Sequence, residues 1–562
     1  MTTRAPALAA LLIGATALVP LGLGAETLVL DGRMGARVTV EIVERYTPKP
    51  GMESLTLRSF RTPSISAATW RQQSLTDEVA YGVPPLRVTT AADAHGNTVL
   101  TERWERPRAP INLVRKVVVQ LDADLKSLDS AAAFPLATVS RDTEAFLAAT
   151  PKVQRDDPRI RDLARRLTAG ARTQHDAVTA IVNHVVDTLK YQAEPPAHDA
   201  VTSLERGVAN CQGFSHLSLA LLRAVGIPAR FAVGISIAKG WRVQHADGSI
   251  TFKMGQGRHA WIEVFYPDVG WLPYDPQSTR MFVSVYHVRQ AVGLDVDDVP
   301  TLVQGAPELP GMEMTVNGES THDAFAIRTV SQLRSPRSFM ATAGVRGGLL
   351  GSPPPPVALP PVAPPPPIDP SVRPRLTKPV EYGNVEFPAS LRILRASPPG
   401  GATVARPSFV VETADYATGA EDLAQAFRVG EPTLLTEVSL ALQKFGGRSG
   451  ELWLELRDDR GRRPGALVAE SERLPVGRLI DRAGYRWVVF GFARQDRGLV
   501  LAPGRYWAVL RSSGDGIFNW YFALGNAYGD PDDSRSSPRG SRDWSNVLNY
   551  RFNFRVTGLV KP

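Results

Sequence analysis

Cysteine is almost absent from this chain, which has a single one, Cys211, among 562 residues. One thiol excludes an internal disulfide framework and any metal site built from several cysteines. A strong charge excess is also missing, because 64 Lys and Arg face 56 Asp and Glu for a net charge of +8. No phosphate-binding glycine motif, no paired zinc ligands and no basic helix occur. We therefore expect no cofactor, no metal and no nucleic-acid partner.

Long hydrophobic runs are missing beyond the N-terminus. Residues 1–25 are typical of a signal peptide, with Arg4 in a short positive region, an apolar stretch at 7–22 and small residues at 24–25. The alternative is an uncleaved anchor, although the apolar stretch is slightly short for a membrane span. We expect a bacterial protein that is periplasmic or secreted, with no membrane span after signal cleavage.

The length and the composition predict several domains. Hydrophobic residues make up 43% of the chain, and Pro (46) and Gly (47) are frequent. Residues 26–150 alternate apolar and polar positions, which predicts an N-terminal β-sandwich. Residues 151–300 change from helical to strand periodicity and predict an α+β core. Residues 301–383 are predicted as an extended Pro-rich linker, and residues 384–562 as a C-terminal β-sandwich. The fold class is multidomain α+β.

Three helices are predicted at the start of the core. The first has Ile160 and Leu163 on one face, and the second begins at Thr173 with Asp176 three residues later, a variant of the capping box. The third begins at Cys211 and ends before Gly226. Antiparallel strands follow these helices.

Cys211 is the candidate nucleophile. A helix N-terminus has free N–H groups and a positive dipole end, which favour the reactive thiolate and can bind an oxyanion. His259 opens a later strand and could act as the base, and Asp275 at the end of the next strand could orient it.

The strand register leaves this triad open. If Asp268 and Val269 formed the centre of a tight turn, Asp275 would face Ile262 and not His259. A bulge or an offset strand is needed to bring the carboxylate to the imidazole.

Three motifs in this region stand in order. They are Gly207-x-x-x-Cys211-x-x-Phe214-Ser215 with the stretch LLRAVGIPAR at 221–230, then HAWIEVFY at 259–266, then GWLPYDP at 270–276. Residues 155–280 therefore resemble the transglutaminase-like superfamily, a branch of the papain-like cysteine enzymes. The resemblance implies a triad of Cys211, His259 and Asp275 and acyl transfer through a thioester to an amine or to water. It also implies a second side chain that assists the oxyanion, for which Gln212 and Tyr191 are the candidates.

The flanking regions resemble known modules more weakly. The segment before the core is similar to the β-sandwich that often precedes this domain in exported bacterial members. Residues 424–465 are similar to jelly-roll modules of bacterial surface proteins, which is a likeness of fold and not of function.

Other side chains have two interpretations each. His216 could have a catalytic part and Trp261 and Trp271 could line a substrate cleft, but all three are interpreted as packing residues. Glu263 is interpreted as a surface charge that could instead shape the site. In the last domain, aromatic residues could stack on sugars but are interpreted as a β-sandwich core: Trp507, Trp520, Tyr521 and Phe522. Three acidic residues could hold calcium but are interpreted as a solvated loop: Asp530, Asp532 and Asp533.

The sequence thus predicts an exported cysteine-dependent acyl-transfer enzyme that acts on peptide or protein amide bonds. We favour hydrolysis over cross-linking, because no motif marks a binding site for an acceptor amine. The alternative is a non-catalytic adhesion or scaffold protein that binds cell-envelope polymers. A further hypothesis is that the N-terminal sandwich covers the cleft and keeps the activity latent. The substrate-binding residues and the oligomeric state are unknown from the sequence.

Overall fold

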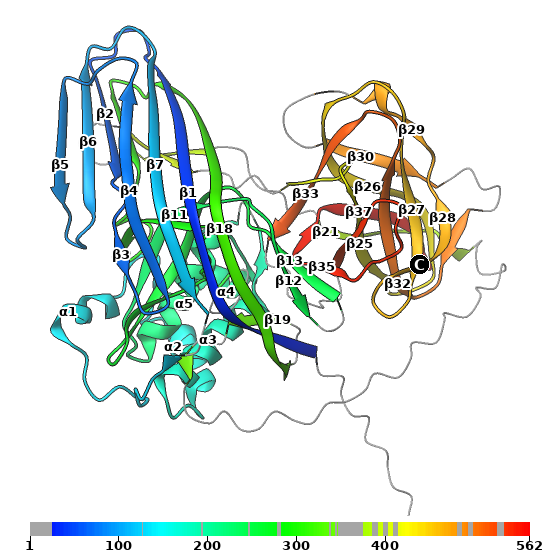
Figure 1. Cartoon of the computed structure of the whole chain (residues 1–562), viewed down its shortest axis with the longest axis horizontal. Helices are drawn as coiled ribbons and strands as arrows, with labels where there is room; N and C mark the ends of the chain where they lie inside the picture. The colour runs from blue at the N-terminus through cyan, green and yellow to red at the C-terminus, as the bar shows by residue number, and fades with distance from the viewer. Residues whose placement is uncertain are drawn as a thin grey trace, which may run out of the picture.

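The structure is a computed structural model, and three bodies are visible in it (Figure 1). It describes residues 25–125, 128–192, 195–245, 248–277, 283–335, 339–342, 345–346, 375–384, 392–396, 403–408, 414–479, 481, 486–492, 498–524 and 533–562. Residues 1–24 of the predicted signal peptide and the proline runs at 353–356 and 364–367 lie outside the described residues.

The N-terminal domain is a pair of β-sheets. The first contains β1 (Ala25–Thr47), β4 (Trp70–Tyr81), β7 (Ile111–Asp124) and β18 (Gly311–Ser335), and the second contains β2 (Ser54–Phe60), β5 (Arg87–Ala92), β6 (Thr98–Glu105) and β17 (Leu302–Ala306). One face of β7 is buried at every second residue, as in a half-covered strand. Tyr46, Leu57 and Trp104 share an apolar cluster that joins the two sheets, so the domain is a sandwich.

The linker prediction is wrong at both ends, and so is the boundary of the C-terminal domain at residue 384. β21 (Lys378–Asn384) pairs with the last strand of the C-terminal sandwich, and β22 (Arg392–Ala396) and β23 (Thr403–Ser408) extend the second sheet of the N-terminal domain next to β17. Residues 302–306 and 311–335 form β17 and β18, and β18 pairs with β1 along most of its length (Figure 1). Met312, Met314 and Val316 alternate along β18 and pack against the apolar clusters of the sandwich. This period-two pattern was the signal of a strand. The chain therefore leaves the N-terminal domain, forms the core and returns to complete the same sheet.

The core packs three helices on a four-stranded antiparallel sheet. The predicted helices are confirmed as α2 (Pro158–Thr168), α3 (Gln174–Thr188) and α5 (Cys211–Ala224), and Thr173 with Asp176 forms the capping box of α3. The sheet order is β15 (Gly270–Tyr274), β14 (Gly257–Tyr266), β11 (Ala229–Ser236) and β16 (His287–Gly293).

The two faces of this core sheet have different neighbours. Ile262 and Val264 of β14 belong to the same apolar cluster as Leu217 of α5, so this face is covered by the helices. Trp261 of β14 instead shares a cluster with Val40 and Leu121 of the N-terminal domain. Residues 259, 261 and 263 alternate with the helix-facing positions, so their side chains are on the face that the N-terminal domain covers.

The C-terminal domain is a β-sandwich. β25 (Glu421–Val429) and β32 (Gly504–Ser512) belong to one sheet, and β26 (Thr433–Gly446), β33 (Ile517–Leu524) and β37 (Phe554–Val560) to the other. The aromatic residues weighed as a sugar platform are core residues instead, with exposed fractions of 0 to 5%: Trp507, Trp520, Tyr521 and Phe522.

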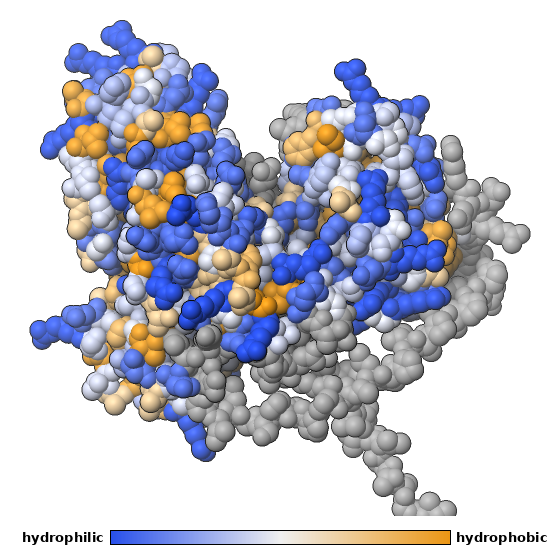
Figure 2. Space-filling view, viewed as in Figure 1, coloured by the Kyte–Doolittle hydropathy of each residue, from blue (hydrophilic) through white to orange (hydrophobic). Residues whose placement is uncertain are grey.

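A hairpin of the core joins this sandwich. β12 (Trp241–His245) and β13 (Gly248–Phe252) extend one of its sheets, since β13 pairs in parallel with β35 (Asn546–Leu548) (Figure 1). On the face in Figure 2, hydrophobic residues form small separate groups on a mostly hydrophilic surface. Among the described residues, no helix has both the length and the apolar character needed to span a membrane.

Candidate active site

Cys211 is the first residue of α5, directly after the N-cap Asn210. The Oδ1 atom of Asn210 accepts hydrogen bonds from the N–H groups of Gln212 (3.1 Å) and Gly213 (3.4 Å). The cap therefore occupies two of the donors that the sequence had made available for an oxyanion. The N–H of Cys211 itself is the donor of the first turn that this cap leaves untouched.

His259 lies in β14 with an exposed fraction of 2%. Its Nε2 atom is 2.9 Å from Oδ2 of Asp275, and its ring also interacts electrostatically with the side chain of Cys211. Because Nε2 is directed at the carboxylate, Nδ1 is the nitrogen available to the thiol. The structure thus brings together all three residues that the sequence named.

The open question of the register is settled by the loop between β14 and β15. Tyr266 pairs with Gly270, so the loop has three residues, Pro267 to Val269, and not two. Val269 N donates to Tyr266 O, and Gly270 has a φ of +88°. This is a turn followed by a left-handed glycine, a common three-residue hairpin connection.

One additional residue in this loop reverses the face of the sheet toward which each side chain of β15 points. With Tyr266 opposite Gly270, the register places Asp275 next to Trp261 and on the same face as His259. Asp275 is then the diagonal neighbour of His259 across the hairpin, a distance that side chains can span. The two-residue turn that would have placed Asp275 opposite Ile262 does not form, and the offset that the triad needs is present.

Asp275 is fully buried, and its carboxylate oxygens accept hydrogen bonds from side chains and from the backbone. Oδ2 accepts from Nε2 of His259 (2.9 Å) and lies 3.3 Å from Nε2 of His287, and Oδ1 accepts from the N–H of Gln277 (2.9 Å). Burial opposes the negative charge, but the charge of His259 and the hydrogen bonds of both histidines hold the pKa of Asp275 well below its usual range.

The contact with Asp275 raises the pKa of His259, whereas it lowers the pKa of Asp275. Burial works against the imidazolium, but the charge and the hydrogen bond of Asp275, together with the contact to Cys211, raise the pKa of His259 to about 10. At neutral pH the ring is therefore protonated, which is the state that a neighbouring thiolate stabilises.

His287 is a residue of the site that the sequence analysis missed. It lies in β16, is 1% exposed, and its ring centroid is 5.6 Å from that of His259. A lone histidine after Asp275 carried no motif, and its proximity depends on strand order. Only the folded sheet identifies it.

The cluster of His259, Asp275 and His287 could be taken for a metal site, since their potential ligand atoms lie within 4.8 Å of one another. The position of the proton on His287 is incompatible with a bound metal ion. Nδ1 of His287 accepts the backbone N–H of Ser284 (3.0 Å), so a neutral His287 has its proton on Nε2, the atom that would have to bind the ion. The arrangement is that of a hydrogen-bonded carboxylate.

Glu263 is not a surface charge, as the sequence had suggested. It is 4% exposed and forms ion pairs with Arg230 and Arg289. Burial alone would raise its pKa, but the two arginines lower the pKa of Glu263 to about 2. Arg230 in turn stacks on Trp271, with 4.1 Å between the guanidinium carbon and the ring centroid. Glu263 therefore joins β14, β11 and β16 behind the site.

The remaining candidates occupy structural positions. His216 is fully buried, with its ring between His198 O and the N–H of Val296, and Trp261 is 1% exposed, so both are packing residues. Tyr191 is 8% exposed and lies on β9 (Lys190–Tyr191). It pairs with Ala209, which precedes Cys211 by two residues.

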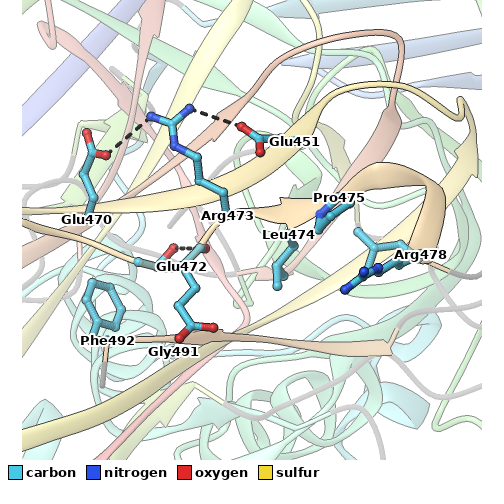
Figure 3. A pocket seen from close by; sticks show the side chains of 11 residues that line it. Glu451, Glu470, Glu472, Arg473, Leu474, Pro475, Arg478, Gly491 and Phe492 are labelled. Carbon is cyan, nitrogen blue, oxygen red and sulfur yellow. Dashed lines mark hydrogen bonds and ion pairs between the residues drawn. The ribbon is translucent and has the colours of Figure 1, made fainter. Parts of the chain in front are cut away.

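A separate recess is present in the C-terminal domain, with a volume of about 680 Å³ (Figure 3). Arg473 crosses it and pairs with Glu451 and Glu470, while Glu472 and Phe492 line another side. The guanidinium group of Arg473 is thus already paired with carboxylates of the recess. Of the acidic residues weighed for calcium, Asp533 is buried among Arg462, Arg505 and Arg535, which replace a metal as its counter-charge. Asp530 and Asp532 lie outside the described residues.

Comparison with known proteins supports the family of the core. Residues 161–276 match the Transglutaminase-like superfamily (Transglut_core). The chain is 29% identical over 126 residues to the uncharacterized protein YebA of Bacillus subtilis (strain 168), covering 21% of this chain and 17% of that protein. It is 37% identical over 98 residues to the uncharacterized protein ML0607 of Mycobacterium leprae (strain TN), covering 17% and 31%. The chain thus spans less than a third of either relative.

Two solved structures match this chain with low sequence identity and TM-scores below 0.5. A candidate cysteine protease from Cytophaga hutchinsonii has 17% identity and a TM-score of 0.38, covering 54% of this chain and 92% of that one. The periplasmic domain of TgpA from Pseudomonas aeruginosa, bound to ethylmercury, has 17% identity and a TM-score of 0.22, covering 45% and 90%. The identifying result is the family match: this chain contains a transglutaminase-like domain, held between β-domains.

Proposed function

We propose that the protein is an exported cysteine-dependent acyl-transfer enzyme that acts on peptide or protein amide bonds. The observation that carries the proposal is the buried pair of His259 and Asp275, 2.9 Å apart, together with the electrostatic interaction of His259 with Cys211 at the start of α5. A nucleophile, a base and a residue that orients the base are the three parts that covalent acyl transfer requires.

In the first half of the reaction, the thiolate of Cys211 attacks the carbonyl carbon of the amide and forms a tetrahedral intermediate. In this proposal the N–H of Cys211, at the N-terminus of α5, donates to the oxyanion. Nδ1 of His259 then gives its proton to the amide nitrogen. The C–N bond breaks, the amine leaves, and a thioester on Cys211 remains.

In the second half, neutral His259 takes a proton from water as the water oxygen attacks the thioester carbon. The C–S bond breaks, the acid leaves, and the thiolate and the imidazolium are restored. Asp275 keeps Nε2–H of His259 directed at itself, so Nδ1 faces the sulfur through both halves.

Hydrolysis is favoured over cross-linking because an acceptor amine would need its own binding site to compete with water. Export follows from the signal-like residues 1–25, and it places the enzyme in the periplasm or outside the cell. The substrate would then be a peptide or a protein there, with cell-envelope polymers as possible partners. Incorporation of a labelled primary amine into a protein substrate at the expense of hydrolysis would favour cross-linking.

The single cysteine provides a direct test. Iodoacetamide should alkylate Cys211 at pH 7 much faster than it alkylates the thiol of an unstructured peptide, because an activated nucleophile reacts as the thiolate. His259→Ala should remove this enhancement, whereas His184→Ala, a change on the outer part of α3, should keep it. An equal rate in wild type and His259→Ala would exclude an activated nucleophile and would favour the scaffold alternative.

A further inference from the structure

We propose that His287 is a positioning residue of this active site, a neutral imidazole whose Nε2–H holds the carboxylate of Asp275 from the side opposite to His259. The inference rests on the proposed function. It concerns the direct contact between Nε2 of His287 and Oδ2 of Asp275, at 3.3 Å, the same oxygen that His259 approaches at 2.9 Å.

Strand irregularity brings His287 to this place. The pairing of β11 with β16 shifts by one residue between Val233 and Gly234, so that Gly234 lies opposite Arg289 and Ser236 opposite His287. The residue passed over, Gln290, forms a β-bulge. A bulge re-aims the side chains beyond it. Here it puts His287 on the face of the sheet that also carries His259, two strands away.

Because Gly234 has no side chain, it leaves room for the rings of His259 and His287 to approach each other. It lies on β11, directly opposite His259. A Cβ atom at this position would stand 1.9 Å from Val288 O and 2.8 Å from the ring of Trp261. Any larger residue would therefore enter the layer in which the two histidines meet. The glycine lets two imidazoles on non-adjacent strands share one carboxylate.

The proton on His287 is fixed by Ser284. The backbone N–H of Ser284 can only donate, and it points at Nδ1 of His287 from 3.0 Å. The hydroxyl of Ser284 is a further partner of the same atom at 3.2 Å. Nδ1 is therefore an acceptor, and the proton of the neutral ring is on Nε2, directed at Asp275.

The same contact prevents His287 from becoming charged. A second proton would have to sit on Nδ1, against the N–H of Ser284. Burial lowers the pKa of His287, and the nearby charge of His259 acts in the same direction against the favourable Asp275. The other ionised neighbours on this face, Glu263 and Arg289, are paired with each other. From β18, Asp323 binds Tyr286 and Lys239.

The chemical consequence is a division of roles between two histidines on one carboxylate. His259 holds the mobile proton of the reaction, and His287 contributes a fixed one. A fixed donor on Oδ2 weakens the pull of Asp275 on His259 and restricts rotation of the carboxylate. His259 then keeps the correct tautomer without holding its proton too strongly to release it to the leaving amine.

The test compares His287→Leu with His287→Gln in the full chain. Leu removes the donor, whereas the amide nitrogen of Gln can replace Nε2–H at a similar reach. The readout is the rate of alkylation of Cys211 by iodoacetamide from pH 5 to 11, with circular dichroism to confirm folding. We expect the step that accompanies loss of the His259 proton to move up by roughly one pH unit in the Leu variant. In the Gln variant it should stay at the wild-type position.

The outcomes separate this inference from the proposed function. If wild type shows the step and both variants keep it unmoved, His287 has no positioning role, while the triad stands. If wild type and His259→Ala have the same profile, the triad itself fails. Should the Leu variant not fold, the ¹⁵N imidazole shifts of wild-type His287 decide: a neutral ring with the proton on Nε2 from pH 5 to 9 is expected. A charged ring or a proton on Nδ1 would overturn the inference.

Discussion

The two β-sandwiches meet the catalytic core in different ways. The N-terminal domain binds the backbone of β16 with buried side-chain amides. Gln72 donates to Arg289 O and accepts from Arg289 N, both at 2.9 Å, and Asn97 makes the same pair of contacts with Val292. These amides satisfy the free edge of the core sheet as a neighbouring strand would.

The C-terminal domain contacts the core chiefly through one hairpin. Lys253 at the end of this hairpin pairs with Asp415 (2.9 Å, 17% and 23% exposed), and Val547 belongs to an apolar cluster that includes core residues. β13 and β35 pair over three residues, and Asn546 and Asn549 accept hydrogen bonds from the core hairpin and its end. The ion pair of Arg242 with Glu421 is 42% and 38% exposed. Pairs of this kind are screened by water and contribute little.

We infer from this difference that the N-terminal domain is coupled to the candidate site more directly than the C-terminal domain is. Trp70 of the N-terminal domain donates from Nε1 to Ser284 O at 3.2 Å, and Ser284 holds His287. Because β18 returns to pair with β1, truncation near residue 150 would break this sheet and not simply uncover a cleft. A test of latency needs point substitutions.

The largest effect is expected inside the site. Asp275→Asn should lower turnover of a peptide amide by roughly 10³- to 10⁴-fold, because the amide no longer fixes the tautomer of His259. Turnover per molecule with intact circular dichroism is the measurement. A decrease of less than about tenfold would show that Asp275 has only a structural role.

The pH dependence of turnover should report on the contact between His259 and Asp275. Turnover requires a protonated His259 to release the amine, so activity should fall as the pH rises through about 10, the pKa of His259. Asp275→Asn removes the charge that raises this pKa, so the alkaline limb should move to lower pH. An alkaline limb that remains in place in Asp275→Asn would contradict the assignment of this limb to His259.

The amides of the N-terminal domain should have the next effect. Gln72→Ala leaves the buried N–H and C=O of Arg289 without partners and should lower the free energy of unfolding by roughly 2 to 4 kcal/mol. Alkylation of Cys211 should also slow in the folded fraction. Gln73→Ala, an exposed neighbour on the same strand, is the matched control. Equal denaturant midpoints for the two variants would remove the distinction between the domains.

The smallest effect is expected at the C-terminal module. Arg242→Ala should change the free energy of unfolding by at most about 1 kcal/mol, because its pair with Glu421 is exposed. The reactivity of Cys211 should be unchanged. A slower alkylation in this variant would show that the hairpin at 241–252 also couples to the active site, and the contrast between the two domains would then be wrong.

Local features of the core could be predicted from the sequence because their causes are local. Thr173 and Asp176 cap α3, and Cys211 begins α5, within a few residues of the pattern that predicted them. The order of the three motifs likewise named Cys211, His259 and Asp275. By contrast, residues 311–335 contain no proline and alternate as a strand does, but the linker prediction extended from the proline runs at 353–367 back to residue 301 and so included β18.

The sequence by itself determined the candidate nucleophile, its helix and the class of domain, since these depend on caps, periodicity and motif residues that are close along the chain. Only the tertiary structure decided which residues meet. The three-residue loop before Gly270 turned Asp275 toward His259, the bulge in β16 brought in His287, and strand packing buried Glu263 with two arginines. The physical reason is that strand register sets the face of every side chain, and one residue more or less reverses it.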